Sequence, residues 1–300
     1  MRYLALEYLG EPFDRVFNLG DDVQTLAVER LLPRVDGHVS REGLDQIREP
    51  AIVAMNGFFM QSDHWPPAAA VTPLFFAFHV APGKRDVILS PEGVAYLKRH
   101  APIGCRDEGT VALLRAQGID AWYSRCVTLT FERREQAPRA GKVFLVAGTS
   151  MDFDSIIPRS LRREAVYVNQ AKLRLPHFSA TLRRQMAAEL LAAYRDHARL
   201  VITTKIHCAM PCIAMGIPVV FLYDAAKRDD YRVRLIEELV GIQYVDDSPL
   251  RGRALNPLRS GKIDWSPAAP DIEALKADIR RDFGEALARA EARFRAGVAA

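Results

Sequence analysis

Short apolar runs alternate along the chain with amphipathic stretches that carry a helical period. Most of the apolar runs contain β-branched residues and lack a clean alternation of apolar and polar positions. This pattern is typical of parallel strands covered on both faces. The strands that it predicts are Ile52–Met55, Leu74–Phe78, Ile103–Cys105, Lys142–Ala147, Ala165–Val168, Leu200–Thr203 and Val219–Tyr223.

Helices are expected between these strands. Apolar side chains recur every four residues over Val23–Leu31 and Leu182–Tyr194, and the stretch Ile272–Phe294 places its apolar residues on roughly one face. Strand and helix units that alternate in this way predict a doubly wound α/β architecture.

One charged segment, Phe131–Lys142 (FERREQAPRAGK), interrupts this alternation. It contains Pro138 and Gly141 and precedes a fresh apolar strand. Such a composition is typical of a domain boundary. We therefore expect two α/β domains, residues 1–140 and residues 141–300, the second of which ends in the terminal helix.

The composition is that of an ordinary globular protein: 300 residues, 49% hydrophobic and 26% charged, with a formal net charge of +4. This charge is too small for the length to indicate a nucleic-acid-binding protein, so no nucleic-acid partner is expected. The longest apolar run falls short of the ~18 residues that a bilayer span needs. Glu7 and Glu11 come too early for a signal peptide. We therefore expect a cytoplasmic protein without a transmembrane segment.

Three polar clusters begin predicted helices, and ligands of open α/β sheets bind at the strand ends that such helices follow. The first cluster is Asn18–Gln24 (NLGDDVQ), where Gly20 permits an unusual backbone angle and Asp21 or Asp22 can cap free N–H groups. The segment is either a plain helix cap or the holder of a polar ligand.

The second cluster is Arg106 and Asp107, between a strand that ends at Cys105 and a helix over Thr110–Ala116. Asp107 suits the N-cap, but an arginine at the positive end of a helix dipole adds little stability. A guanidinium and a helix N-terminus together bind phosphate or carboxylate. Arg106 therefore indicates an anionic ligand, with an interdomain salt bridge as the alternative.

The third cluster, Thr204–His207, follows a strand and precedes a short buried helix, Cys208–Met215. A lone histidine at such a turn is more often structural than catalytic. Lys227 follows the next strand and is expected at the same end of the sheet, so the two side chains favour an anion site.

A metal site is the other explanation for His207, because Cys208 and Cys212 stand close to it in the sequence. Adjacent helical positions face different ways, so only the pair four apart shares a face. The chain also has no CxxC pair at zinc spacing. The four cysteines are better explained as small buried apolar side chains, and we expect no metal and no cofactor.

Taken together, three segments resemble the polysaccharide pyruvyl transferase family. They are NLGDDVQTLAVERLL, GCRDEGTVALLRAQGI and TTKIHCAMPCIAMGIPVVFLYDAAK, and they stand in the order of the family's motifs. The resemblance implies two Rossmann-like domains in an arrangement like that of the GT-B glycosyltransferases, with phosphoenolpyruvate as the donor.

The resemblance also assigns candidate residues. The arginine, histidine and lysine that bind the donor in the family match Arg106, His207 and Lys227, and Thr204 and Lys205 belong to the same donor motif. The N-terminal domain is then expected to bind the acceptor, with these candidates: Asn18, Gly20, Asp21, Gln24 and His79.

The implied reaction forms a ketal on a sugar of a bacterial-type polysaccharide or its precursor, free or carrier-linked. His207, with Arg106 and Lys227 beside it, is the candidate general acid or phosphate partner, because a histidine pKa is tunable near neutrality. Asp21 is the candidate that orients or deprotonates the acceptor hydroxyl. A nucleotide-sugar glycosyltransferase of the same fold and a non-catalytic carbohydrate-binding protein are the two alternatives.

Overall fold

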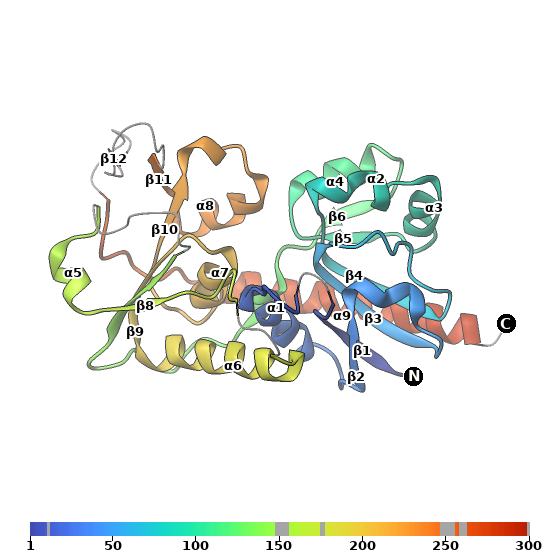
Figure 1. The fold of residues 1–300 in the computed structure, drawn as a ribbon, viewed down its shortest axis with the longest axis horizontal. Helices are drawn as coiled ribbons and strands as arrows, with labels where there is room; N and C mark the ends of the chain where they lie inside the picture. The colour runs from blue at the N-terminus through green and yellow to red at the C-terminus, as the bar shows by residue number, and fades with distance from the viewer. Residues whose placement is uncertain (11–12, 148–155, 175–177, 247–255, 258–262, 299–300) are drawn as a thin grey trace.

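The computed structural model describes residues 1–10, 13–147, 156–174, 178–246, 256–257 and 263–298. Within them the chain forms two six-stranded sheets (Figure 1). The first sheet has the order β2-β1-β3-β4-β5-β6, with β1 (Tyr3–Glu7), β2 (Gly37–Ser40), β3 (Ala51–Phe59), β4 (Val71–Val80), β5 (Ile103–Cys105) and β6 (Ala121–Tyr123).

The second sheet has the order β12-β11-β10-β9-β7-β8. Its strands are β7 (Lys142–Val146), β8 (Ala165–Val168), β9 (Ala198–Thr203), β10 (Val219–Asp224), β11 (Gln243–Asp246) and β12 (Asn256–Pro257). Neighbouring strands of both sheets run parallel, apart from β11 and β12, which pair antiparallel. The mixed α/β class expected from the buried apolar runs is confirmed.

The helices of the described residues connect and cover these strands. They are α1 (Leu19–Glu29), α2 (Arg85–Ile88), α3 (Pro91–Arg99), α4 (Glu108–Arg115), α5 (Arg159–Arg163), α6 (Ala180–His197), α7 (Ile206–Ala214), α8 (Arg234–Val240) and α9 (Glu273–Val298). None of them is both long and apolar enough to cross a membrane.

Every predicted strand overlaps an observed one, and the predicted strands Ile103–Cys105 and Ala165–Val168 coincide with β5 and β8. Strands β1, β2, β6, β11 and β12 were not expected. Two of them lack a buried apolar run: β2 is half-exposed along its length, and β6 is three residues long. The chain passes between the sheets from β6 to β7, and the division near residue 140 into acceptor and donor domains stays a prediction.

One continuous apolar core joins the two sheets. It includes Val23 of α1, Phe76 of β4 and Phe144 of β7, together with much of α6 and α7. Helix α1 of the first half packs against α6 and α7 of the second half. The two halves are therefore tied together by buried side chains as well as by the chain itself.

Helix α9 returns to the first sheet, although the sequence groups it with the second half (Figure 1). Its Phe283 packs edge-on against Phe76 of β4, with ring centroids 5.2 Å apart. Nearer the C-terminus, Tyr3 Oη donates to Glu291 Oε1 at 2.7 Å, and Arg293 donates to the carbonyl of His100 at 3.0 Å. The terminal helix thus fastens the first sheet to the shared core.

We expect Phe283→Ala to lower the free energy of unfolding by about 3–5 kcal/mol, because a fully buried ring is replaced by a cavity. Gly284→Ala is the matched control on the same helix, since a Cβ there meets nothing within 4 Å. This control should raise the stability by up to ~1 kcal/mol through helix propensity. Urea titration of both variants measures the difference, and a loss at Phe283 no larger than 1 kcal/mol contradicts the role of α9.

Candidate active site

A cavity of about 550 Å³ lies between the two halves, at the carboxyl ends of the parallel strands. Most of the residues predicted for a site line it. They are Asn18, Gly20, Asp21, Arg106, Thr204, Lys205, His207 and Lys227. Segments far apart in the sequence therefore converge on one cavity, as expected for ligands at the carboxyl edge of a parallel sheet.

The first turns of α1 and α7 meet at this cavity. A Cβ placed on Gly20 would lie 3.1 Å from the Cβ of His207, so the glycine allows this close approach. Helix α1 is capped by Asn18, whose Oδ1 accepts from the Gly20 N–H at 3.0 Å. The N-cap residue of helix α7 is Lys205, whose side chain makes no capping hydrogen bond. Its first turn therefore directs positive partial charge toward the cavity.

Pro211 and Gln170 fix the position of His207. Helix α7 begins two residues earlier than predicted, so Pro211 lies inside it and leaves the carbonyl of His207 without its usual backbone donor. The Nε2 amide of Gln170 donates to that carbonyl at 3.3 Å. The backbone carbonyl of Gln170 accepts from the N–H of Leu19 at 2.8 Å. One residue thus links the first turns of both helices.

The imidazole of His207 is held neutral. Burial lowers its pKa well below the ordinary value, and the nearby charges of Arg106 and Arg232 lower it further. Its Nε2 is buried and has no hydrogen-bond partner among the described residues. An unsatisfied buried nitrogen between cations is a ready partner for an anionic or hydroxyl-bearing ligand.

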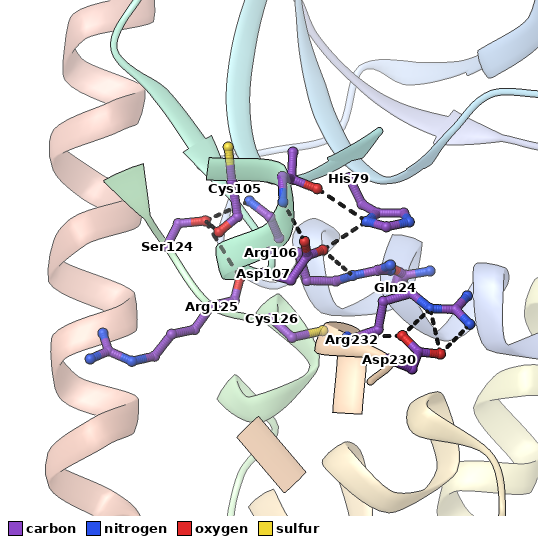
Figure 2. Close-up of polar contacts among 12 residues, drawn as sticks. Gln24, His79, Cys105, Arg106, Asp107, Ser124, Arg125, Cys126, Asp230 and Arg232 are labelled. Atoms are coloured by element: carbon purple, nitrogen blue, oxygen red, sulfur yellow. Dashed lines mark hydrogen bonds and ion pairs between the residues drawn. The ribbon is translucent and has the colours of Figure 1, made fainter. Parts of the chain in front are cut away.

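Arg106 reaches the cavity from the turn between β5 and α4, and Gln24 supports it (Figure 2). The guanidinium is nearly buried, and its NH1 donates to Gln24 Oε1 at 3.3 Å. Its ion pair is with the neighbouring Asp107, at 3.9 Å, so it does not form the interdomain salt bridge considered above.

Gln24 and His79 do not line the cavity, although both were candidates for acceptor binding. Gln24 is fully buried, and a Cβ on Gly57 would lie 2.9 Å from its Oε1. His79 is also fully buried; its Nδ1 lies 2.7 Å from Asp107 Oδ2 and 3.2 Å from Thr110 Oγ1 (Figure 2). Both side chains contact the Arg106–Asp107 turn, so they hold this turn in place without lining the cavity.

Asp21 lines the cavity on the side of the first half. Burial raises its pKa, and the charges of Arg41 and Arg106 only partly offset this effect. Gln24 Nε2 lies 3.5 Å from Asp21 Oδ1, so the amide that holds Arg106 also contacts this carboxyl group. A carboxyl group with a raised pKa is suited to carry a proton at neutral pH.

Three lysines gather at the side of the second half. Lys205 is half-buried, and burial lowers its pKa, as do the charges of Lys172 and Lys227. Lys227 is largely exposed and lies 3.4 Å from Asp224 Oδ2. Lys227 is the only one of the three with a carboxylate at ion-pair distance among the described residues, so their like charges repel one another and favour an anion in the cavity.

Sequence reasoning missed Arg41, Lys172 and Arg232, which also line the cavity. The guanidinium of Arg41 is buried against Tyr8, Phe13 and Phe58, whose ring centroids lie 5.0, 5.3 and 5.7 Å from it. Arg41 and Arg232 adjoin other charged residues in the sequence, where a basic side chain is normally solvated, and Lys172 is exposed. Only the tertiary fold brings the three to one cavity, so the sequence offered no local signal.

The described residues include no group of three or more His, Cys, Asp or Glu side chains that could hold a metal ion. Cys208 and Cys212 are buried free thiols, as the apolar interpretation expects. The cavity is therefore described by its cations, its two helix N-termini and a single carboxyl group with a raised pKa.

A family model described as polysaccharide pyruvyl transferase matches residues 18–224. Among solved structures, the chain is similar to an uncharacterized protein of Klebsiella pneumoniae, at 12% identity and a TM-score of 0.47, over 81% of this chain and 92% of that one. It is also similar to a protein of Listeria monocytogenes assigned as a UDP-N-acetylglucosamine 2-epimerase, at 12% identity and a TM-score of 0.41, over 100% of this chain and 91% of that one. No curated protein matches the chain.

We expect Lys205→Gln to stabilise the ligand-free protein by on the order of 1 kcal/mol, because it removes a half-buried charge beside two other lysines. The pKa of Lys205 is lower in the folded than in the unfolded state. The charged lysine therefore destabilises the folded protein by its full amount at every pH below the folded pKa. The gain should therefore shrink as the pH rises from that value toward 10.5.

Chemical unfolding between pH 7 and pH 10 measures this gain. Lys142→Gln is the control, because Lys142 is exposed at the start of β7 and its replacement should change stability by less than ~0.5 kcal/mol. If Lys205→Gln is no more stable than the wild type at pH 7, or is more stable by the same amount at every pH, repulsion among the three lysines does not destabilise the folded protein.

Proposed function

Because the chain belongs to the polysaccharide pyruvyl transferase family, we propose that it transfers pyruvate from phosphoenolpyruvate to a sugar of a polysaccharide or its precursor, forming a ketal. The observation that carries this proposal is the cavity between the halves, whose described lining has six cationic side chains and two carboxylates around a neutral histidine. We also propose that the two sheets belong to Rossmann-like domains in a GT-B-like arrangement.

The charge of the cavity supports an anionic donor. Its lining includes more cations than carboxylates, and they come from both halves: Arg41, Arg106, Lys172, Lys205, Lys227 and Arg232, against Asp21 and Asp224. Phosphoenolpyruvate carries a phosphate and a carboxylate, so it needs positive charge at two ends. The uncapped first turn of α7 adds N–H groups suited to a phosphate oxygen.

The part of the cavity wall that the first half forms is suited to a sugar acceptor. Phe13, Phe17 and Phe58 line it, with Gln61 at its margin. Aromatic faces with a few polar groups are typical of small-molecule sites, where the rings supply contact area and the polar groups supply orientation. In this proposal the acceptor ring lies against the aromatic wall with its hydroxyl groups toward Asp21.

The reaction requires a proton on the methylene carbon of the donor and removes one from each of two acceptor hydroxyls. One of these protons ends on the new methyl group and the other leaves with phosphate. Asp21, whose pKa burial raises, is the carboxyl group suited to carry them. Arg106 and the lysines stabilise the departing phosphate by fixed positive charge. His207, neutral in the free protein, takes the role of phosphate partner through its unsatisfied Nε2 and gains a proton as the phosphate binds.

A ligand scan tests this proposal. Phosphoenolpyruvate at a hundred times its dissociation constant should stabilise the protein by roughly 2.7 kcal/mol, and UDP and GDP should not. Arg106→Ala and Lys227→Ala should each weaken binding about 10–100-fold, since each removes a charged partner. Arg228→Ala is the matched control: the residue adjoins Lys227 but stacks on Tyr244 outside the cavity. Stabilisation by a nucleotide in place of phosphoenolpyruvate would favour a glycosyltransferase.

Donor binding should be accompanied by proton uptake at His207. In the free protein its pKa lies well below 6.5, and a bound dianion raises it. The affinity of the wild type should therefore rise, relative to His207→Asn, as the pH falls from 7 to 6. Calorimetry in buffers of different ionisation enthalpy counts the protons, and the variant subtracts the titration of the ligand's own phosphate. Equal uptake by both proteins rules out His207 as the phosphate partner.

A further inference from the structure

A short 3₁₀ turn, Tyr231–Val233, lies between the two halves of the molecule. Its three residues point in three directions: Tyr231 contacts the first turn of α4, Arg232 lines the cavity, and Val233 is buried in the shared core. The turn belongs to the second half by sequence and touches the first half through Tyr231. The position of Arg232 therefore depends on both halves.

Gly109 makes the contact with Tyr231 possible. A Cβ on Gly109 would lie 2.5 Å from Cγ of the tyrosine ring and 2.6 Å from both Cδ atoms. The ring also lies beside His79, with centroids 6.3 Å apart. Any side chain at position 109 would therefore push the turn away from α4, and Arg232 would move with it.

Asp230 fixes the guanidinium of Arg232 on one side (Figure 2). Its Oδ1 accepts from the Arg232 backbone N–H at 3.0 Å and from Nε at 2.8 Å, and its Oδ2 accepts from NH2 and from Tyr223 Oη. Burial alone would raise the pKa of Asp230, but these hydrogen bonds outweigh it and hold the pKa at about 2. No described residue accepts from NH1 of Arg232, which leaves that edge of the guanidinium for a ligand.

Arg232 acts on the same group as Arg106. After burial, the charges of these two arginines are the main causes of the lowered pKa of His207. Arg106 comes from the first half and is nearly buried, whereas Arg232 comes from the second half and is partly exposed to the cavity. A small anion beside His207 is thus within the field of a guanidinium from each half.

We propose that Arg232 binds the anionic donor together with Arg106, and that the docking of Tyr231 on Gly109 holds it in the binding position. This inference rests on the proposed function only in taking phosphoenolpyruvate as the donor. It adds a binding residue that no motif indicated, from the half opposite to that of Arg106.

The binding role is tested by calorimetric titration of phosphoenolpyruvate into the wild type, Arg232→Ala and Arg234→Ala. We expect Arg232→Ala to weaken binding at least tenfold. Arg234→Ala is the matched control two residues along: Arg234 makes an exposed ion pair with Glu108 at 3.4 Å and does not line the cavity. It should leave the dissociation constant within twofold of the wild type.

The positioning role of Gly109 is tested by a double-mutant cycle. Gly109→Ala should weaken binding several-fold in the wild-type background and produce no further loss in the Arg232→Ala background, because its effect acts through Arg232. A merely structural defect would weaken both backgrounds equally. Thermal unfolding without ligand confirms that each variant is folded at the temperature of the titration.

The outcomes separate the two proposals. If the wild type binds no phosphoenolpyruvate, the proposed function fails. If the wild type binds and Arg232→Ala binds equally well, the proposed function stands and Arg232 is not a donor-binding residue. Additive losses in the cycle, with a clear loss in Arg232→Ala, retain the binding role and overturn the docking of Tyr231.

Discussion

Gln170 joins the first turns of α1 and α7, accepting from Leu19 through its backbone and donating to the carbonyl of His207 through its side chain. Both turns carry the positive end of a helix dipole, and bringing them together is unfavourable without such a link. Pro211 makes the link possible, because it has no N–H to occupy that carbonyl. The close approach of Gly20 to His207 and the unsatisfied Nε2 of the imidazole both depend on this arrangement.

The described lining of the cavity has more cationic than anionic side chains. Lys205 has a lowered pKa, His207 is held neutral, and Asp21 has a raised pKa. Burial is the largest cause of each of these three pKa shifts, and each shift disfavours the charged form of its group. A fold optimised for stability alone would replace such groups with apolar side chains, so their retention indicates that ligand binding sets the composition here.

The sequence predicted the mixed α/β class and most of the candidate residues that line the cavity, because both depend on local patterns. Buried strands such as Ile103–Cys105 need only an apolar run, and Arg106 and His207 were found because each follows a strand and precedes a helix. Half-exposed β2 has no such run. Gln24 follows the first turn of α1 and His79 is near the end of β4, but packing turns their side chains onto Arg106 and Asp107. Arg232 lies in a run of charged residues, and only tertiary contacts, among them that of Tyr231 with Gly109, distinguish it from a solvated arginine.

The apolar core that runs from β4 through α1 to β7 constrains how a ligand enters and leaves. Separating the halves as rigid bodies would part α1 from α6 and α7 and expose apolar side chains such as Val23, each at a cost of about 1.5–3 kcal/mol. Exchange of substrate and product by a wide hinge opening is thus strongly disfavoured. Displacement of a few surface residues beside the cavity costs far less. On this fold, turnover should be gated by local rearrangement at the cavity mouth, with the two sheets staying in register throughout the cycle.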